Sequence, residues 1–178
     1  MSRALLVLDL TRDVANREGR FGGPHGTAEH SHSRDVPAKI SSAIEIAREI
    51  GDLVVWILPS DELFLANAMP ASDDWGGEVD EDYGTPLDGE IVIRKTAIDP
   101  FVKSDLEADL RTSGVDEVVL VGISTTHVVS ATARGAVDRG FTTIVAADGC
   151  ADHSEEAHRD ALAALPAEVL ISDLAQIW

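Results

Sequence analysis

Six short apolar runs divide the chain and predict buried strands. They cover Ala4–Leu10, Leu53–Leu58, Glu90–Arg94, Glu117–Val121, Thr142–Ala146 and Glu168–Ile171. Runs that are apolar throughout, rather than at every second position, are typical of parallel strands covered on both faces. Pro59 ends the second run, because proline has no N–H to donate within a sheet.

Amphipathic segments lie between the runs and predict helices. The clearest is Val36–Ile50, which starts after a candidate N-cap at Asp35 and stops before Gly51. Three more helices are predicted over Val102–Thr112, Thr126–Arg139 and Glu155–Leu165. Ser154 is placed to cap the last of these helices.

This alternation of strands and helices predicts an α/β fold over 1–178 as one domain. Right-handed crossovers place helices on both faces, giving a three-layer α/β/α arrangement around a mostly parallel, Rossmann-like sheet of about six strands. Two stretches do not fit the alternation. Residues 12–35 are rich in glycine and predict a long loop, and residues 61–90 predict an irregular acidic excursion with one helical turn near Leu63–Ala68.

Three candidate chemical groups fall at the ends of predicted strands. Asp9 ends the first strand, Lys95 follows the third, and the loop Gly122–Thr125 follows the fourth. Ligands of open parallel sheets bind at the carboxyl ends of the strands. We therefore expect these groups to meet at one edge of the sheet and to bind a small molecule there.

The net charge limits which classes of partner the chain can bind, and the cysteine content and apolar runs indicate its compartment. The chain has 178 residues and a formal net charge of -18, which argues against nucleic acid and against an anionic membrane surface, since both require a basic face. One cysteine, Cys150, cannot form an intramolecular disulfide. With no signal pattern and no apolar run long enough to span a bilayer, we expect a cytoplasmic protein.

Four segments of this sequence resemble the isochorismatase-like, or cysteine hydrolase, superfamily: ALLVLDLTRDV, IRKTAIDPF, GISTTHVVSATARGAVDRGF and AADGCADHSEEAH. In the amidase members an Asp, a Lys and a Cys form a catalytic triad. The resemblance implies that Asp9 and Lys95 take the first two positions and that Val128 stands where the cysteine would be. Valine has no lone pair, so a thioester route is excluded at this position.

The same resemblance implies a binding loop after the fourth strand. It predicts a cis peptide at Ile123–Ser124 and backbone N–H groups near residues 124 and 128 that form an oxyanion hole. Ile123, Ser124 and Thr125 are therefore candidate substrate-binding residues. We expect the hydroxyls of Thr125 and Thr126 to cap the following helix and His127 to point away from the nucleophile position.

Isochorismatase members without the cysteine cleave a vinyl ether, and the resemblance implies that chemistry here. A protonated Asp9 would donate to the vinyl carbon, with Lys95 as its electrostatic partner, and water would add to the resulting cation. Two alternatives stay open. In the first, the chain keeps a buried Asp9–Lys95 pair as a non-catalytic binding or scaffold protein. In the second, it is an amidase with a displaced nucleophile at Cys150, although a buried structural role suits that cysteine better.

Substrate recognition is harder to predict. Isochorismate carries two carboxylates, yet the segment 61–90 has no Lys or Arg, so a neutral or cationic substrate is also consistent with the sequence. Arg94 is the nearest cation apart from Lys95, and Trp75 offers a stacking face. The amidase members bind a metal, but His25, His30 and His32 are expected to be solvated, and we expect neither metal nor cofactor. The apolar end Leu174–Trp178 is consistent with a homo-oligomer.

Overall fold

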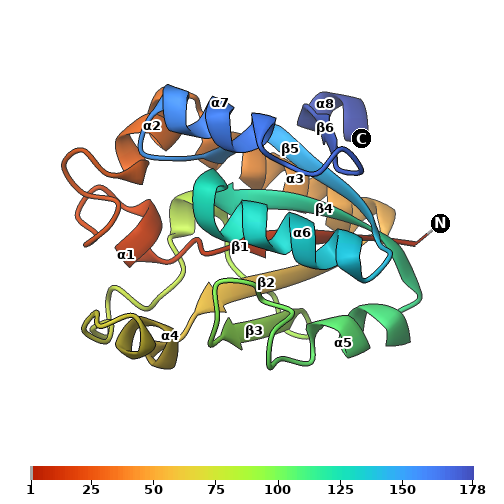
Figure 1. The fold of residues 1–178 in the computed structure, drawn as a ribbon, viewed down its shortest axis with the longest axis horizontal. Coiled ribbons are helices and arrows are strands. Elements are labelled where there is room, and N and C mark those ends of the chain that lie inside the picture. The colour runs from red at the N-terminus through yellow and green to blue at the C-terminus, as the bar shows by residue number, and fades with distance from the viewer. Residues whose placement is uncertain (1) are drawn as a thin grey trace.

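A six-stranded parallel sheet forms the centre of the computed structural model, which describes residues 2–178. The strand order is β3-β2-β1-β4-β5-β6 (Figure 1). The strands are β1 (Ser2–Leu8), β2 (Leu53–Pro59), β3 (Ile91–Lys95), β4 (Val115–Ile123), β5 (Thr142–Ala151) and β6 (Leu170–Ser172). All adjacent strands run parallel, which confirms the predicted α/β class.

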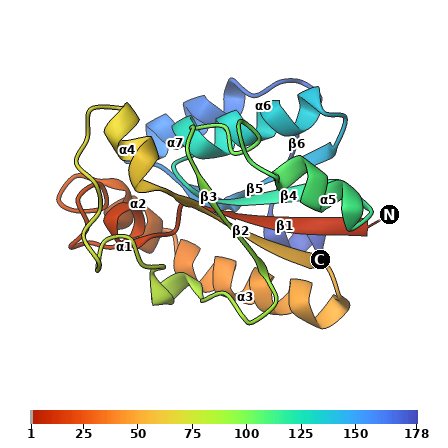
Figure 2. The ribbon, with the colours of Figure 1, turned by 90° about the horizontal axis from the view of Figure 1, so that it is seen from below.

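Helices cover both faces of the sheet. Figure 2 shows α3 on one side and α6 and α7 on the other. The helices are α1 (Arg12–Ala15), α2 (Thr27–Ser33), α3 (Val36–Ile50), α4 (Asp61–Ala66), α5 (Leu106–Thr112), α6 (Ser130–Asp138), α7 (Glu155–Ala163) and α8 (Leu174–Ile177), with a 3-10 turn η1 (Glu81–Tyr83) and a π-helical turn η2 (Thr125–Val129).

The apolar strands supply two separate cores because successive side chains point to opposite faces. Leu6 and Leu8 of β1 pack in one cluster with residues of α5 and α6. Leu5 and Val7 pack in the other cluster with the apolar side of α3. Each of these leucines and valines is fully buried, and burial of such a side chain contributes about 1.5–3 kcal/mol.

The strand order places a switch point between β1 and β4. The chain builds β1, β2 and β3 outward in one direction and then returns to add β4 on the other side of β1. Leu8, the last residue of β1, lies opposite Gly122 in β4. Ligands of such sheets bind in the crevice where the order reverses, so the segments that leave β1 and β4 bound the expected site.

Residues 12–35 are more ordered than the sequence predicts. The expected long loop contains α1 and α2, and α2 buries Thr27, Ala28 and Ser31. Backbone hydrogen bonds fold the intervening glycine-rich turn back on α1, including one from Phe21 N to Asp13 O of 2.8 Å. Tertiary contacts therefore override the low helix propensity of this stretch.

The segment 61–90 is irregular, as predicted, and backbone hydrogen bonds hold it against the start of α1. It contains α4, which Ser60 caps by accepting from the N–H of Leu63, and η1. Arg12 N donates to Glu78 O at 2.9 Å, and Asp80 N donates to Leu10 O at 2.9 Å. These bonds flank an antiparallel bridge between Thr11 and Val79, so the excursion closes over the segment that follows β1.

Several helix boundaries differ from the prediction. The helix expected from Val102 begins at Leu106, and Lys103 in the turn before it has a φ of 54°. Asp35 stands at the N-cap position of α3, as predicted, but it has a φ of 59° and its side chain makes no cap bond. Gly51 closes α3 with a φ of 81°, and the hydroxyl of Ser154 accepts from Ala157 N at 3.2 Å, as expected.

The C-terminal residues form α8 and pack on the chain's own core. Leu174 is buried, while Ile177 and Trp178 lie against the cluster that contains α3. The indole N–H of Trp178 donates to Asp52 at 3.1 Å, and the Arg3 guanidinium lies 5.5 Å from the centre of its ring. Within residues 2–178, no helix is both long enough and apolar enough to cross a membrane.

Candidate active site

Asp9 and Lys95 meet at the carboxyl edge of the sheet, as the sequence predicts. Asp9 directly follows β1, has a φ of 56°, and donates its N–H to Ile57 O at 2.8 Å. Lys95 is the last residue of β3 and pairs with Pro59 of β2. Because β2 separates the two strands, only a long side chain can reach from β3 to Asp9. Lys95 Nζ lies 3.1 Å from Asp9 Oδ2.

Burial dominates the electrostatics of this pair. Asp9 is 9% exposed and Lys95 is 1% exposed. Loss of hydration raises the pKa of Asp9 to about 6, although the charge of Lys95 and its hydrogen bond act in the opposite direction. Within residues 2–178, Oδ1 of Asp9 is buried and has no hydrogen-bond partner. The carboxyl group thus has one oxygen held by a cation and the other free to transfer or receive a proton.

The loop after β4 approaches β1 closely. Gly122 has a φ of 138°, and a Cβ at this position would lie 2.2 Å from the carbonyl oxygen of Leu8, so no other residue fits. The Ile123–Ser124 peptide bond is cis, as the resemblance implies. Ile123 is buried, and Ser124 is partly exposed at the end of the loop.

A π-helical turn, not a regular α-helix, follows this loop. The predicted helix over Thr126–Arg139 is therefore wrong in its first turn, because η2 (Thr125–Val129) precedes α6. Val128 lies in this turn, is 1% exposed, and packs in the same core cluster as Leu8. Its side chain presents only methyl groups where the family resemblance implies a nucleophile.

The hydroxyl of Thr125 bonds to β5 and α7 and does not cap the helix, so the predicted capping role is wrong. No side-chain cap bond is made at this helix start. Instead, Thr125 Oγ1 donates to Ala151 O at 3.1 Å and lies 2.7 Å from Nδ1 of His158 on α7. Thr126 N donates to a carboxylate oxygen of Asp152 at 2.6 Å. These contacts tie η2 to the end of β5 and to α7.

His158 is a buried histidine that the sequence reading did not single out. It is 2% exposed. Desolvation and the nearby charge of Arg34 lower its pKa to about 4, so the ring is neutral at physiological pH. Because Thr125 has a single hydroxyl proton and gives it to Ala151 O, Nδ1 of His158 carries the hydrogen in this arrangement. His158 ends the segment AADGCADHSEEAH, which carries the family resemblance, but nothing in the sequence spacing indicates that it contacts Thr125.

Two other candidates lie where the sequence placed them. Cys150 is fully buried in β5, and its Sγ lies 3.7 Å from Leu120 O. Burial raises the pKa of its thiol to about 12, so the reactive thiolate does not form near neutral pH. His127 is exposed and its Nδ1 lies 2.9 Å from Ser124 Oγ, directly beside the loop.

Trp75 lies in the acidic excursion, and Arg94, the residue before Lys95 in β3, bonds to that excursion. The Arg12 guanidinium lies 5.6 Å from the centre of the Trp75 ring, which is 38% exposed. Arg94 donates to Gly77 O at 3.1 Å and to Pro59 O at 3.3 Å. Arg94 also lines a cavity of about 410 Å³ whose other charged residues are all acidic: Asp61, Asp73, Asp74 and Glu78.

The three histidines of the first loop do not converge. His30 contacts Asp152 and Glu155 through its two ring nitrogens, while His32 Nδ1 donates to Ala28 O and Nε2 of the same ring faces Asp82. His25 is exposed. Over residues 2–178, no group of three or more His, Cys, Asp or Glu side chains is arranged to hold a metal ion.

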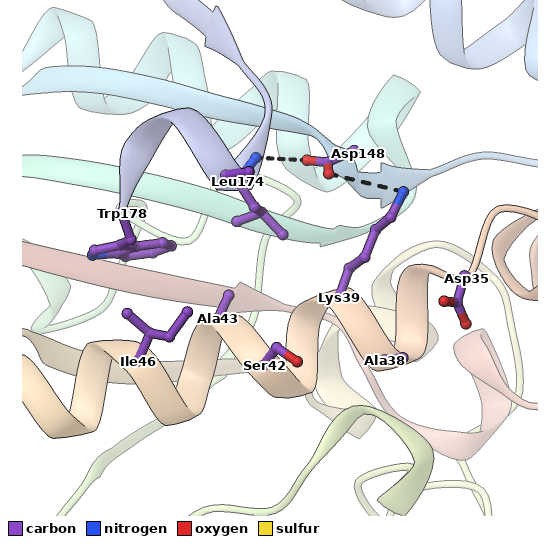
Figure 3. Close-up of a pocket in the computed structure, with 10 residues that line it drawn as sticks. Asp35, Ala38, Lys39, Ser42, Ala43, Ile46, Asp148, Leu174 and Trp178 are labelled. Carbon is purple, nitrogen blue, oxygen red and sulfur yellow. Dashed lines mark hydrogen bonds and ion pairs between the residues drawn. The ribbon is translucent and has the colours of Figure 1, made fainter.

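Three cavities on the surface do not include the Asp9–Lys95 pair. Figure 3 shows one of about 400 Å³ between α3 and α8, where Asp148 accepts from Leu174 N and pairs with Lys39. Another, of about 620 Å³, lies between α6 and α7 and includes Ile98, Thr126 and His127. Neither of these cavities, nor the acidic one near Arg94, is lined by Asp9, Lys95 or Val128.

Comparison with known proteins identifies a matching family. The profile of the Isochorismatase domain matches residues 3–174. The uncharacterized isochorismatase family protein YecD of Escherichia coli O157:H7 is 41% identical over 75 residues, which cover 42% of this chain and 40% of that protein. The ureidoacrylate amidohydrolase RutB of Methylobacterium radiotolerans is 29% identical over 179 residues, covering 85% of this chain and 69% of that protein.

A solved structure shares the whole fold. An isochorismatase-like hydrolase from Alkaliphilus metalliredigens superposes with a TM-score of 0.84 at 23% identity, over 99% of this chain and 88% of that chain. At this identity the likeness concerns the fold alone. The matched segment spans less than half the length of YecD, so the activity, substrate and partners have to be argued from the residues of this chain.

Proposed function

The chain belongs to the isochorismatase family, and on this premise we propose that it is a hydrolase of small molecules that works without a thiol nucleophile. The reaction that fits its residues is cleavage of a vinyl ether in an isochorismate-like molecule. Asp9 is the general acid and Lys95 its electrostatic partner. The proposal treats residues 1–178 as one hydrolase domain of a cytoplasmic homo-oligomer.

One observation carries the proposal: the carboxyl group of Asp9 is buried, protonatable near pH 6, and has a free oxygen. General acid catalysis is most effective when the pKa of the acid is close to the working pH. An exposed aspartate, with its ordinary pKa near 3.9, would hold too little proton at neutral pH. Burial beside Lys95 therefore gives Asp9 the property that the reaction needs.

The chemistry balances with these groups and water. Asp9 gives its proton to the terminal vinyl carbon, and the positive charge left on the neighbouring carbon is shared with the ether oxygen. Lys95, 3.1 Å away, stabilises the carboxylate that forms. Water then adds to the cationic carbon and returns a proton to Asp9. The hemiketal collapses to a carbonyl compound and an alcohol, so the net reaction consumes one water molecule.

The surroundings favour a substrate with little negative charge. The cavity beside the strand ends has four acidic side chains against Arg94 alone, and Arg94 already donates to two backbone carbonyls. A dianion such as isochorismate would be repelled there. We therefore place the substrate among neutral or cationic vinyl ethers.

Replacement of the acid tests the proposal. Asp9→Asn keeps the shape of the side chain and removes its proton donor, whereas Asp116→Asn changes an exposed aspartate at the amino end of β4. Purified variants would be assayed by mass spectrometry against a panel of vinyl ethers, amides and esters. We expect a loss of about 100-fold or more for Asp9→Asn and none for Asp116→Asn. Unchanged vinyl-ether turnover in Asp9→Asn would sink the proposal.

A second candidate function is small-molecule binding without turnover. It is supported by the apolar, buried side chain of Val128 and by the absence of Asp9 from the cavities described above. In that case Asp9 and Lys95 form a buried ion pair that only maintains the fold. Calorimetric binding of a compound that the protein leaves intact throughout the same panel would favour this function.

A further inference from the structure

Two buried side-chain atoms in residues 2–178 lack a hydrogen-bond partner, and they lie two residues apart. They are Oδ1 of Asp9 and Oγ1 of Thr11, both in the segment that leaves β1. Buried hydroxyl groups in folded proteins nearly always have a partner, and exceptions point to a bound water or ligand. Asp9 has a role in the proposed reaction. Thr11, which is 1% exposed, has none yet.

The free hydroxyl of Thr11 is unexpected because the residue occupies the N-cap position of α1. A threonine at this position normally accepts a hydrogen bond from the second or third N–H of the helix. Here Asp13 N donates to Gly76 O at 3.0 Å, and Val14 N donates to the carbonyl of Thr11 at 3.0 Å. Both capping donors are already satisfied by backbone oxygens, which leaves the Thr11 hydroxyl without that task.

The backbone alone also holds Thr11 in place. It forms the antiparallel bridge with Val79, and the neighbouring residues Leu10 and Arg12 bond to Asp80 and Glu78. A valine has the same shape as threonine and would fill this buried position without an unsatisfied oxygen. The hydroxyl of Thr11 therefore makes no bond that holds the fold together, and its hydrogen-bond partner is expected to be a bound water or ligand.

We propose that Thr11 is a binding residue of the Asp9 site, and that its hydroxyl holds a neutral oxygen beside the catalytic carboxyl. That oxygen is either a water molecule or a hydroxyl or carbonyl group of the substrate; the second reading rests on the proposed function. A neutral group fits because the cations of this region already pair with carboxylates: Lys95 with Asp9, Arg12 with Glu78, and Arg20 with Asp13. A hydroxyl can donate to such an oxygen or accept from it.

Stability measurements separate a binding role from a structural one. Thr11→Val removes the hydroxyl without changing the shape, and Thr143→Val is the matched control, because the buried Thr143 hydroxyl donates to Phe141 O at 3.0 Å. We expect the urea midpoint to fall for Thr143→Val and to stay or rise for Thr11→Val. An equal fall in both variants, together with a crystal structure in which no ordered oxygen lies beside Thr11 Oγ1, would show that the hydroxyl has a partner within the chain and would overturn the proposal.

A crystal structure of the wild-type protein tests binding without any assay. We expect an ordered oxygen atom within hydrogen-bonding distance of Thr11 Oγ1, and its loss in Thr11→Val. An empty space beside the hydroxyl would overturn the proposal. This result does not depend on turnover, so it remains decisive even if Asp9→Asn shows that the proposed reaction is wrong.

Kinetics on the vinyl-ether panel distinguish the two sources of the oxygen. We expect Thr11→Val to lower kcat/KM about tenfold, and Thr11→Ser, which keeps the hydroxyl, to restore most of it. A loss confined to KM identifies a substrate group, and a loss confined to kcat identifies the water that adds to the cation. Wild-type kcat/KM in Thr11→Val, together with an inactive Asp9→Asn, would place Thr11 outside the working site.

Discussion

Lys95 Nζ lies 3.1 Å from Asp9 Oδ2, and its side chain reaches there across the end of the strand that separates β3 from β1. The contact joins a cation that is 1% exposed to a carboxyl group whose pKa burial raises to about 6. The cation limits that rise and holds the anion that forms when the proton leaves. The pH dependence of the protein should therefore report on this pair.

The rate of vinyl-ether cleavage should fall as the pH rises through about 6. The active form of a general acid is protonated, and the pKa of Asp9 is raised to about 6. We expect kcat to be level below that pH and to fall about tenfold for each further pH unit well above it. Initial rates from pH 4.5 to 8 measure this. A rate that increases through pH 6 would instead identify the Asp9 carboxylate as a base.

Removal of the cation should move that fall in rate to higher pH. Lys95→Met takes away the charge that lowers the pKa of Asp9, and only desolvation remains. A charged hydrogen bond contributes about 1.5–3 kcal/mol, so the midpoint should rise by about one pH unit or more. Carboxyl 13C NMR would follow Asp9 directly. Lys39→Met, at a partly exposed contact with Asp148 of 3.8 Å, is the control and should leave the midpoint unchanged.

Two buried groups should make opposite contributions to stability between pH 4 and 6. The pKa of His158 is lowered from 6.5 to about 4, so its contribution is present above 6.5 and is lost as the pH falls toward 4. The pKa of Asp9 is raised from 3.8 to about 6, so its contribution is present below 3.8 and is lost as the pH rises through 6. Each is worth at most about 3 kcal/mol.

The variant His158→Asn separates these contributions. It keeps a polar atom near Thr125 but removes the titrating ring. We expect the free energy of unfolding of this variant, taken relative to the wild type, to decrease from pH 4 to pH 6, because the stability that the neutral His158 ring adds over this window is missing. The carboxyl groups with shifted pKa values titrate in both proteins and cancel in this difference. Urea unfolding at pH 4, 5 and 6 measures both, and parallel profiles would contradict the assignment of His158 as the opposing group.

A thiol at Val128 should react where the native thiol does not. Cys150 is buried and its pKa is raised to about 12, so iodoacetamide should not modify the folded wild-type protein, and Cys150→Ala should retain full activity. Val128 is 1% exposed, so burial alone would also protect a thiol there. If Val128 stands at the nucleophile position, its place at the start of η2 and α6 should lower the pKa of the thiol in Val128→Cys. That variant in the Cys150→Ala background should then be alkylated near pH 7 at the rate at which local opening exposes the turn, with a cost in stability of about 1 kcal/mol. Activity lost in Cys150→Ala would instead support a displaced nucleophile.

The sequence was sufficient to predict the sheet and the meeting of Asp9 with Lys95. Continuous apolar runs such as those of β1 and β4 are typical of strands that are buried on both faces of a parallel sheet. Parallel strands bring their carboxyl ends to the same edge of the sheet. The positions of Asp9 and Lys95 follow from that rule without knowledge of any side-chain contact.

The remaining parts of the site depend on contacts between distant segments. Nothing in the spacing of Thr125 and His158 shows that they touch, and the predicted capping role of Thr125 failed because the hydroxyl bonds to Ala151 and His158 instead. The helices inside 12–35 were missed for the same reason, since α2 is stabilised by burial against its neighbours rather than by its own composition. That the Thr11 hydroxyl lacks a partner follows only from the structure, which shows that the nearby N–H groups of Asp13 and Val14 bond to backbone oxygens.

Backbone hydrogen bonds hold residues 76–80 against the start of α1, and their opening can be measured separately from global unfolding. Arg12, Asp13 and Asp80 donate their amide protons across this seam, to Glu78, Gly76 and Leu10, whereas the amides of β1 and β4 lie inside the sheet between neighbouring strands. Hydrogen exchange at these three amides therefore measures how often the excursion separates from residues 10–13. Exchange within β1 and β4 measures only global unfolding.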